Sequence, residues 1–273
     1  MRRVRFVFAA LLVCAMAVVA TACSPAAEPE PGPEPKVAPP VIGEAGVLRV
    51  GVDLGYPPYA GTDKGREAGI DIDIAAALAT ELGLALELVE VGAADAPAAL
   101  QSGQIDIAMG VPFTEAAVLD ASFAGWYVAS GPALFSSVET SVTPEQLGRV
   151  RVAVQQDSES FWDLAHTYGA DALVVTETLR EAFELLAADE VDAVAGDALV
   201  GAYLARDFET VAFSSQLAPA TPIGITVATD AAELEAVIRE ALDTLASAGI
   251  LDTVRAKWVD DLPVLETATI AEE

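Results

Sequence analysis

Residues 48–74 read LRVGVDLGYPPYAGTDKGREAGIDIDI, and this stretch decides the fold. Apolar residues alternate over residues 48–52, which predicts a short buried strand. The turn-rich segment 55–61 can continue neither a strand nor a helix. An acidic start at Asp71 then leads into an apolar helical run that ends at Gly83. Ligands of open α/β sheets bind where strands pass into loops, so this loop is expected to form one wall of a ligand site.

The same pattern occurs a second time along the chain. Residues 150–154 (VRVAV) mirror residues 48–52 (LRVGV), and residues 190–196 (EVDAVAG) echo residues 104–110 (QIDIAMG). The repeat predicts an α/β protein of two similar lobes, each a mostly parallel sheet flanked by helices. The chain is expected to cross between the lobes near residues 130–135 and 222–225, as a two-strand hinge.

The expected division of the chain follows from these patterns and from its ends. It comprises a signal peptide over residues 1–22, a Pro/Glu-rich tether over 23–43, a first lobe over 44–130 with 225–262, a second lobe over 131–224, and an acidic, loose tail over 263–273. The segment Thr21-Ala22-Cys23 follows the apolar run of the leader and resembles a bacterial lipoprotein signal. That resemblance implies that Cys23 is acylated and anchors the protein to the outer face of the cell membrane. Ordinary secretion with a free thiol is the alternative.

The composition excludes some classes of function. The chain has 273 residues, an apolar fraction of 53% and a formal net charge of −28 at pH 7. Nucleic-acid binding requires a basic surface, so it is not expected. The charge agrees with a cationic ligand, or it serves solubility alone. No run after the leader is as apolar as a membrane span requires.

Short motifs carry a family resemblance over residues 48–258. They are Val50-Gly51-Val52-Asp53 with Tyr56-Pro57-Pro58-Tyr59, Gly69-Ile70-Asp71-Ile72-Asp73, Leu100-Gln101-Ser102-Gly103 with Asp106, Val191-Asp192-Ala193 with Asp197, and Lys257-Trp258. Together they resemble the family 3 extracellular solute-binding proteins of ABC importers. The resemblance implies a periplasmic binding protein-like (type II) fold that closes on an amino-acid-like ligand and delivers it to an ABC permease. It implies no cofactor and no metal. A monomer is expected.

The resemblance also implies roles for particular residues. Asp197 takes the ammonium group of the ligand, Tyr56 covers the ligand, and Asp53 lies beside it. The full predicted ligand-binding set is Asp53, Tyr56, Tyr59, Met109, Gly110, Pro112, Thr114, Gln156, Asp157, Ser158 and Asp197. Ser158 is also expected to cap a helix, while Asp106 and Asp192, which recur in both lobes, are expected to serve the fold.

One departure from the family changes the expected ligand. Ala117 stands where the family places an Arg that holds a carboxylate through two charge-assisted bonds. Asp157 adds a third carboxylate to a predicted site that already contains Asp53 and Asp197. Such a site repels an anion, so the sequence predicts an amine-bearing or cationic solute held by carboxylates and aromatic faces.

Two other functions remain open at this stage. The chain has no G-x-S-x-G, H-E-x-x-H, C-x-x-C or P-loop motif, but a dehydratase-like enzyme that uses only carboxylates would show no such signature. The segment 109–112 is similar to one in periplasmic partner proteins of quinoprotein dehydrogenases. Of the three functions, the sequence favours a binding protein without catalytic activity.

Overall fold

The computed structural model describes residues 34–116 and 120–268. The signal peptide, Cys23, most of the tether, Ala117 and the end of the acidic tail lie outside the described residues, so the predictions on them stay predictions. Within the described part of the chain, no helix combines the length and apolar character needed to cross a membrane.

The strand predicted from residues 48–52 is β1 (Val47–Val52), which lies inside the first of two five-stranded sheets. The order of this sheet is β4 (Ala85–Glu90), β1, β5 (Ile107–Pro112), β12 (Thr221–Ala228) and β6 (Ala121–Ser130). β1 pairs in parallel with β4 and β5, whereas β12 runs antiparallel to β5 and β6. One strand therefore opposes the other four.

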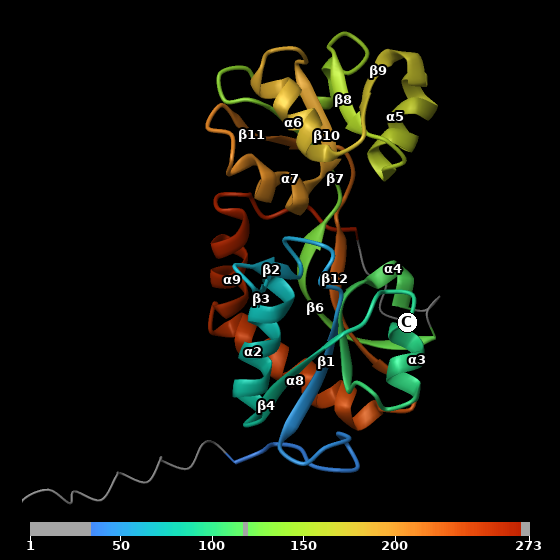
Figure 1. Ribbon diagram of the computed structural model, residues 1–273, viewed down its shortest axis with the longest axis vertical. Helices are drawn as coiled ribbons and strands as arrows, with labels where there is room; N and C mark the ends of the chain where they lie inside the picture. The colour runs from blue at the N-terminus through green and yellow to red at the C-terminus, as the bar shows by residue number, and fades with distance from the viewer. Residues whose placement is uncertain (1–33, 117–119, 269–273) are drawn as a thin grey trace, which may run out of the picture. The chain divides into compact units, whose positions relative to one another are not determined.

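The second sheet repeats this arrangement. Its order is β9 (Leu173–Thr176), β8 (Val152–Gln155), β10 (Ala193–Asp197), β7 (Pro132–Ser137) and β11 (Val211–Gln216). β8 pairs in parallel with β9 and β10, and β7 is antiparallel to β10 and β11. The predicted fold class and the internal repeat are confirmed, and β8 with β10 occupies the place that β1 with β5 has in the first sheet (Figure 1).

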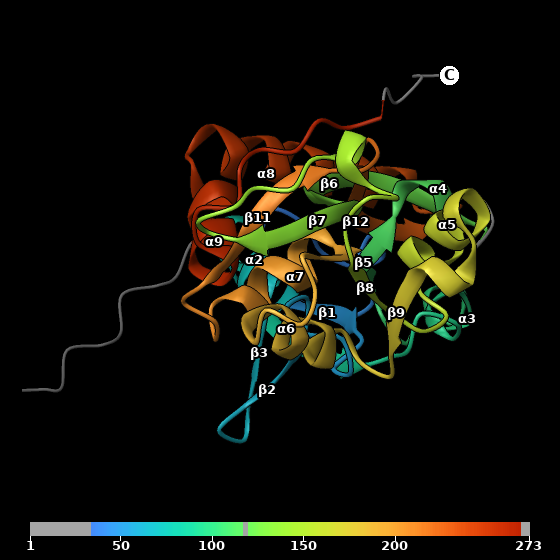
Figure 2. The same cartoon turned by 90° about the horizontal axis from the view of Figure 1, so that it is seen from above.

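Helices cover both faces of each sheet. On the first sheet, α2 (Ile70–Leu82), α8 (Ala232–Ser247) and α9 (Ile250–Val259) pack together over one face, and α3 (Ala96–Gln101) and α4 (Phe113–Ala116) cover the other. On the second, α6 (Leu179–Ala187) and α7 (Ala198–Ala205) lie opposite α5 (Glu159–Tyr168) (Figure 2). Short elements complete the fold, namely β2 (Gly61–Asp63), β3 (Arg66–Ala68) and the 3₁₀ turns η2 (Pro144–Gln146) and η3 (Ala170–Ala172).

The ends of α2 and β5 test the sequence predictions in opposite ways. α2 ends where expected, at Gly83, which adopts the left-handed conformation with φ of 70°. The repeated motif QIDIAMG ends at Gly110, but β5 continues to Pro112, because Val111 and Pro112 pair with the antiparallel strand β12. A positive φ at Gly110 therefore bends the strand without ending it.

The two crossings between the sheets lie side by side. β6 ends at Ser130 in the first sheet, and β7 starts at Pro132 in the second. A Cβ added to Gly131, between them, would lie 3.1 Å from the Cα of Ala220 in the returning segment. The small residue at this position allows the two crossing segments to pass closely.

Both ends of the described chain pack more closely than the sequence suggested. The end of the tether lies on α2, because the N–H of Lys36 donates to the carbonyl of Leu82 over 2.9 Å, and Val37 is buried. The prediction that the C-terminal tail is loose is wrong for the part that the structure describes, up to residue 268. Leu265 is buried, and the N–H of Ala220 donates to the carbonyl of Glu266 over 2.7 Å.

Candidate functional site

Asp197 lies at the junction of a strand and a helix. It is the last residue of β10 and the N-cap of α7, and its Oδ1 accepts a hydrogen bond from the N–H of Val200 over 2.8 Å. Its Oδ2 accepts the hydroxyl hydrogen of Ser130 over 2.6 Å. Burial raises the pKa of Asp197 above its ordinary value, and the charge of Glu159 adds to the effect, although these hydrogen bonds oppose it. The carboxylate is held in one orientation at the carboxyl end of the strand.

The segment between β8 and α5 supplies a second acidic group. Asp157 has a φ of 58° and is exposed, and its Oδ2 accepts a hydrogen bond from Nε2 of Gln156 over 3.0 Å. Ser158 is the N-cap of α5, as the sequence predicts, and its Oγ accepts the N–H of Phe161 over 3.1 Å. The hydroxyl hydrogen of Ser158 is donated to the carbonyl of Gln155, so this side chain is engaged within its own turn.

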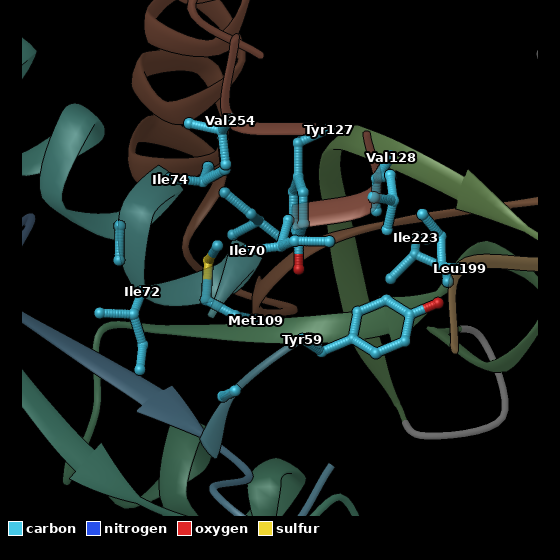
Figure 3. Close-up of a cluster of buried hydrophobic side chains, with 14 of the residues drawn as sticks. Tyr59, Ile70, Ile72, Ile74, Met109, Tyr127, Val128, Leu199, Ile223 and Val254 are labelled. Carbon is cyan, nitrogen blue, oxygen red and sulfur yellow. The ribbon is translucent and has the colours of Figure 1, made fainter. Parts of the chain in front are cut away.

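The loop after β1 presents one aromatic ring to solvent and buries another. Tyr56 is 58% exposed, whereas Tyr59 is 7% exposed, and the two rings stack with centroids 5.6 Å apart. The hydroxyl of Tyr59 points toward Leu199 of the second sheet's helix α7 (Figure 3). Partial desolvation of Tyr56 and burial of Tyr59 raise the pKa of the two hydroxyls, and the charge of Asp197 contributes in each case. The electrostatic influence of Asp197 thus reaches the loop of the first sheet.

A cavity of about 340 Å³ lies where these segments meet. Its lining residues are Tyr56, Gly131, Pro132, Gln155, Gln156, Asp157, Ser158, Glu159, Ser160, Leu179, Gly196, Asp197 and Val200. Five of the predicted ligand-binding residues are among them, namely Tyr56, Gln156, Asp157, Ser158 and Asp197. The cavity therefore joins the loop after β1 to the helix starts of the second sheet.

The other six predicted residues do not line this cavity. Asp53 is exposed, and its Oδ1 accepts the N–H of Gly55 over 3.0 Å. Tyr59 and Met109 belong to the buried cluster in Figure 3. Gly110, Pro112 and Thr114 lie at the end of β5 and in α4.

Two residues of this region were not predicted from the sequence as site residues. Glu159 lines the cavity from the first position of α5, directly after the N-cap, where an acidic residue ordinarily only favours the helix start. Ser130 holds Asp197 from a strand of the other sheet, and no local pattern marks such a partner.

A buried acidic group lies beneath the loop of the first sheet. Asp71 is 2% exposed, and its Oδ1 accepts the hydroxyl hydrogen of Tyr127 over 2.5 Å. The N–H of Gly110 donates to the same tyrosine oxygen over 2.8 Å. Burial raises the pKa of Asp71 to about 7, and the bond from Tyr127 offsets this only in part. The sequence suggested no more than a charge at a helix start.

The raised pKa of Asp71 predicts a stability that falls as pH rises. The ordinary pKa of 3.8 applies to the unfolded chain and about 7 to the folded one, so the folded state holds an extra proton between these values. The contribution of this proton to the free energy of unfolding is complete below pH 3.8 and is lost as the pH rises through about 7. We expect a loss of about 3 kcal/mol between pH 5 and pH 8 from this group.

The Asp71→Asn variant tests this expectation, because it keeps the shape and removes the titration. Urea denaturation of both proteins at pH 5, 6, 7 and 8 should show the variant gaining stability relative to the wild type across the series. A stability difference that stays constant over this range would contradict the assignment to Asp71.

The two mixed α/β sheets of five strands each have the architecture of a solute-binding protein fold. A family model described as bacterial extracellular solute-binding proteins, family 3, matches residues 48–261, and the chain belongs to this family. No curated protein matches the sequence.

Solved structures extend the comparison. An ancestral cationic amino acid solute-binding protein is 30% identical, covers 78% of this chain and 96% of its own, and has a TM-score of 0.68. An ancestral arginine-binding protein bound to arginine is also 30% identical, covers 78% and 98%, and has a TM-score of 0.54. The unliganded open L-cystine solute receptor of Neisseria gonorrhoeae is 23% identical, covers 81% and 95%, and shares the fold with a TM-score of 0.71.

Proposed function

We propose that the chain is the extracytoplasmic substrate-binding lipoprotein of an ABC importer and captures a small amine-bearing or cationic solute. Cys23 would anchor it to the outer face of the membrane, and two lobes, one built on each five-stranded sheet, would close on the ligand. The solute would pass unchanged to a permease. Membership of the solute-binding family supports the general role.

The acidic lining of the cavity carries the proposal for the ligand. Asp157, Glu159 and Asp197 line it, and none of the described lining residues is Lys, Arg or His. Within residues 34–116 and 120–268, none of these three carboxylates forms an ion pair. Burial of Asp197 without a counter-charge is unfavourable, and a bound cation would remove that penalty. These three groups would repel a ligand carboxylate placed beside them.

Further support comes from the aromatic wall and the comparisons. Tyr56 offers an exposed face, stacked on Tyr59, that a cationic group can approach. Two proteins whose structures are 30% identical to this chain are described as binding cationic amino acids or arginine. Ala117, where the family has a carboxylate-binding Arg, favours ligands whose carboxylate is absent or contributes little.

Calorimetric titration against L-arginine, agmatine, glycine betaine, L-glutamine and L-glutamate tests the proposal. The first three carry a cationic group free to meet the acidic lining, and at least one should bind with a Kd well below that of L-glutamine. L-glutamate should not bind. Tight binding of L-glutamate, with no binding of the cations, would reject the cationic site.

Two further measurements separate the importer role from the alternatives. Mass spectrometry of the ligand after long incubation should return it unchanged, since conversion would mean a dehydratase-like enzyme. A pull-down from membranes of the source cell should recover a permease. Recovery of a quinoprotein dehydrogenase instead would favour a partner protein of that enzyme.

A further inference from the structure

Ser130 occupies a special place between the two sheets. It is the last residue of β6, where it pairs with Thr221 of the first sheet, and its side chain is buried at 3% exposure. The next residue, Gly131, leads into the second sheet, and its carbonyl accepts the N–H of Ala198 over 2.9 Å. Ser130 is therefore a residue of one sheet placed against the first turn of α7, which belongs to the other.

The hydrogen bonds of Ser130 fix the direction of its hydroxyl. The N–H of Leu199 donates to its Oγ over 3.1 Å. The hydroxyl donates its hydrogen to Oδ2 of Asp197 over 2.6 Å. An ionised carboxylate can only accept, so the hydrogen of this contact comes from the serine, while a lone pair of the serine oxygen accepts the backbone N–H.

Asp197 is then held from two sides. Oδ1 accepts the N–H of Val200, and Oδ2 accepts the hydroxyl of Ser130. A carboxylate has about four acceptor positions, so these two bonds fix the group and leave other positions for a ligand. The bond to Val200 lies within the first turn of α7, whereas the bond to Ser130 is the one that comes from the other sheet.

We propose that Ser130 is a positioning residue that keeps the carboxylate of Asp197 ionised and oriented toward the cavity. The part of this proposal that concerns ligand affinity rests on the proposed function. The part that concerns the carboxylate itself does not, because the hydrogen bonds that support it are present without a ligand.

The surroundings of Asp197 explain why a single donor matters. The charged group that acts on it is Glu159, whose charge opposes ionisation of Asp197. The charge of Asp197 in turn raises the pKa of Tyr56 and Tyr59, which face it from the loop after β1. Burial also opposes ionisation, and the hydroxyl of Ser130 is the first of the groups that favour it. Removing that hydroxyl leaves the opposing effects in place, so the pKa of Asp197 should rise further.

The test compares Ser130→Ala with Ser130→Thr, which keeps the hydroxyl, and with Ser136→Ala as a matched control. Ser136 lies in β7 and is as buried as Ser130, and its Oγ accepts the N–H of Val142. Neither Ser136 nor Val142 lines the cavity. The direct measurement is the pKa of the Asp197 carboxyl, followed by carbon-detected NMR in the ligand-free proteins. We expect Ser130→Ala to raise it by about one unit, and Ser130→Thr and Ser136→Ala to leave it near the wild-type value.

L-arginine is the probe for the effect on binding. Its affinity at pH 7 should fall about tenfold in Ser130→Ala, and the pH at which binding is half lost should move upward with the pKa of the carboxyl. Ser130→Thr should restore both. An unchanged carboxyl pKa in Ser130→Ala, or an equal shift in Ser136→Ala, would overturn the proposal. Failure of the wild type to bind any cation would count against the proposed function alone, since the NMR titration needs no ligand.

Discussion

The Asp197→Asn variant should lose about a hundredfold or more of the affinity for L-arginine or agmatine, whichever the wild type binds. The substitution removes the charge from the most enclosed carboxylate of the cavity and changes little else. Asn caps helices as well as Asp, so its side-chain oxygen can still accept the N–H of Val200. Because burial disfavours the charge of Asp197, its removal should not destabilise the fold. Calorimetric titration and urea denaturation of the same preparation measure the two effects.

The Asp53→Asn variant is the matched comparison, because it separates two views of the site. The sequence resemblance puts Asp53 beside the ligand. In the structure Asp53 is exposed, bonded to the N–H of Gly55, and absent from the cavity lining. If the cavity is the binding site, the affinity of this variant should stay within about twofold of the wild type. Equal losses in Asp53→Asn and Asp197→Asn would instead favour the wider site that the sequence predicts.

Periodicity and capping signals were enough to predict the architecture. The alternation over residues 48–52 and its repeat over residues 150–154 correspond to β1 and β8, each parallel to two neighbours in its own sheet. The N-cap at Ser158 and the helix end at Gly83 were also predicted, because each depends on residues close by in the chain. Signals of this kind act over a few residues and can be read directly from the sequence.

Pairs of similar residues show where the sequence falls short. Asp71 and Asp73 both lie in the first turn of α2, yet Asp71 is buried against Tyr127 while Asp73 accepts hydrogen bonds from Lys257 and Trp258 of α9. Tyr56 and Tyr59 lie in the same loop, yet Tyr56 is 58% exposed and Tyr59 is 7% exposed. In both pairs the difference is made by residues distant in sequence, which no local pattern reveals.

The candidate site also combines a residue that the sequence predicted with residues that it did not. Asp197 was predicted as a ligand-binding residue, but its hydrogen-bond partner Ser130 was not, since the two are joined only by the crossing of the chain from β6 to β7. Glu159 reads as an ordinary acidic residue at a helix start. Its contribution to the cavity depends on how α5 faces α7, which the sequence does not specify.

One repeated motif gives an internal comparison of buried and exposed ion pairs. In the first sheet Arg49 pairs with Asp106, and in the second Arg151 pairs with Asp192, at equivalent positions of the repeat. In each pair the carboxylate accepts both the backbone N–H and the guanidinium of its arginine. The side chain of Asp106 is 4% exposed and that of Asp192 is 42% exposed. The two ion pairs therefore have the same bonding groups and differ in how deeply they are buried.

The Asp106→Asn variant should lower the free energy of unfolding by about 3–5 kcal/mol, and Asp192→Asn by about 1 kcal/mol. Asp106 accepts four donors, including the N–H of Gly43, and an amide nitrogen in place of one oxygen would face donors with no acceptor. The guanidinium of Arg49, 16% exposed, would also keep its charge with little access to water. Arg151, at 56%, can be solvated instead. Urea denaturation of the two variants measures the difference, and equal losses would mean that the shared bonding pattern, rather than burial, determines the stability that this motif contributes.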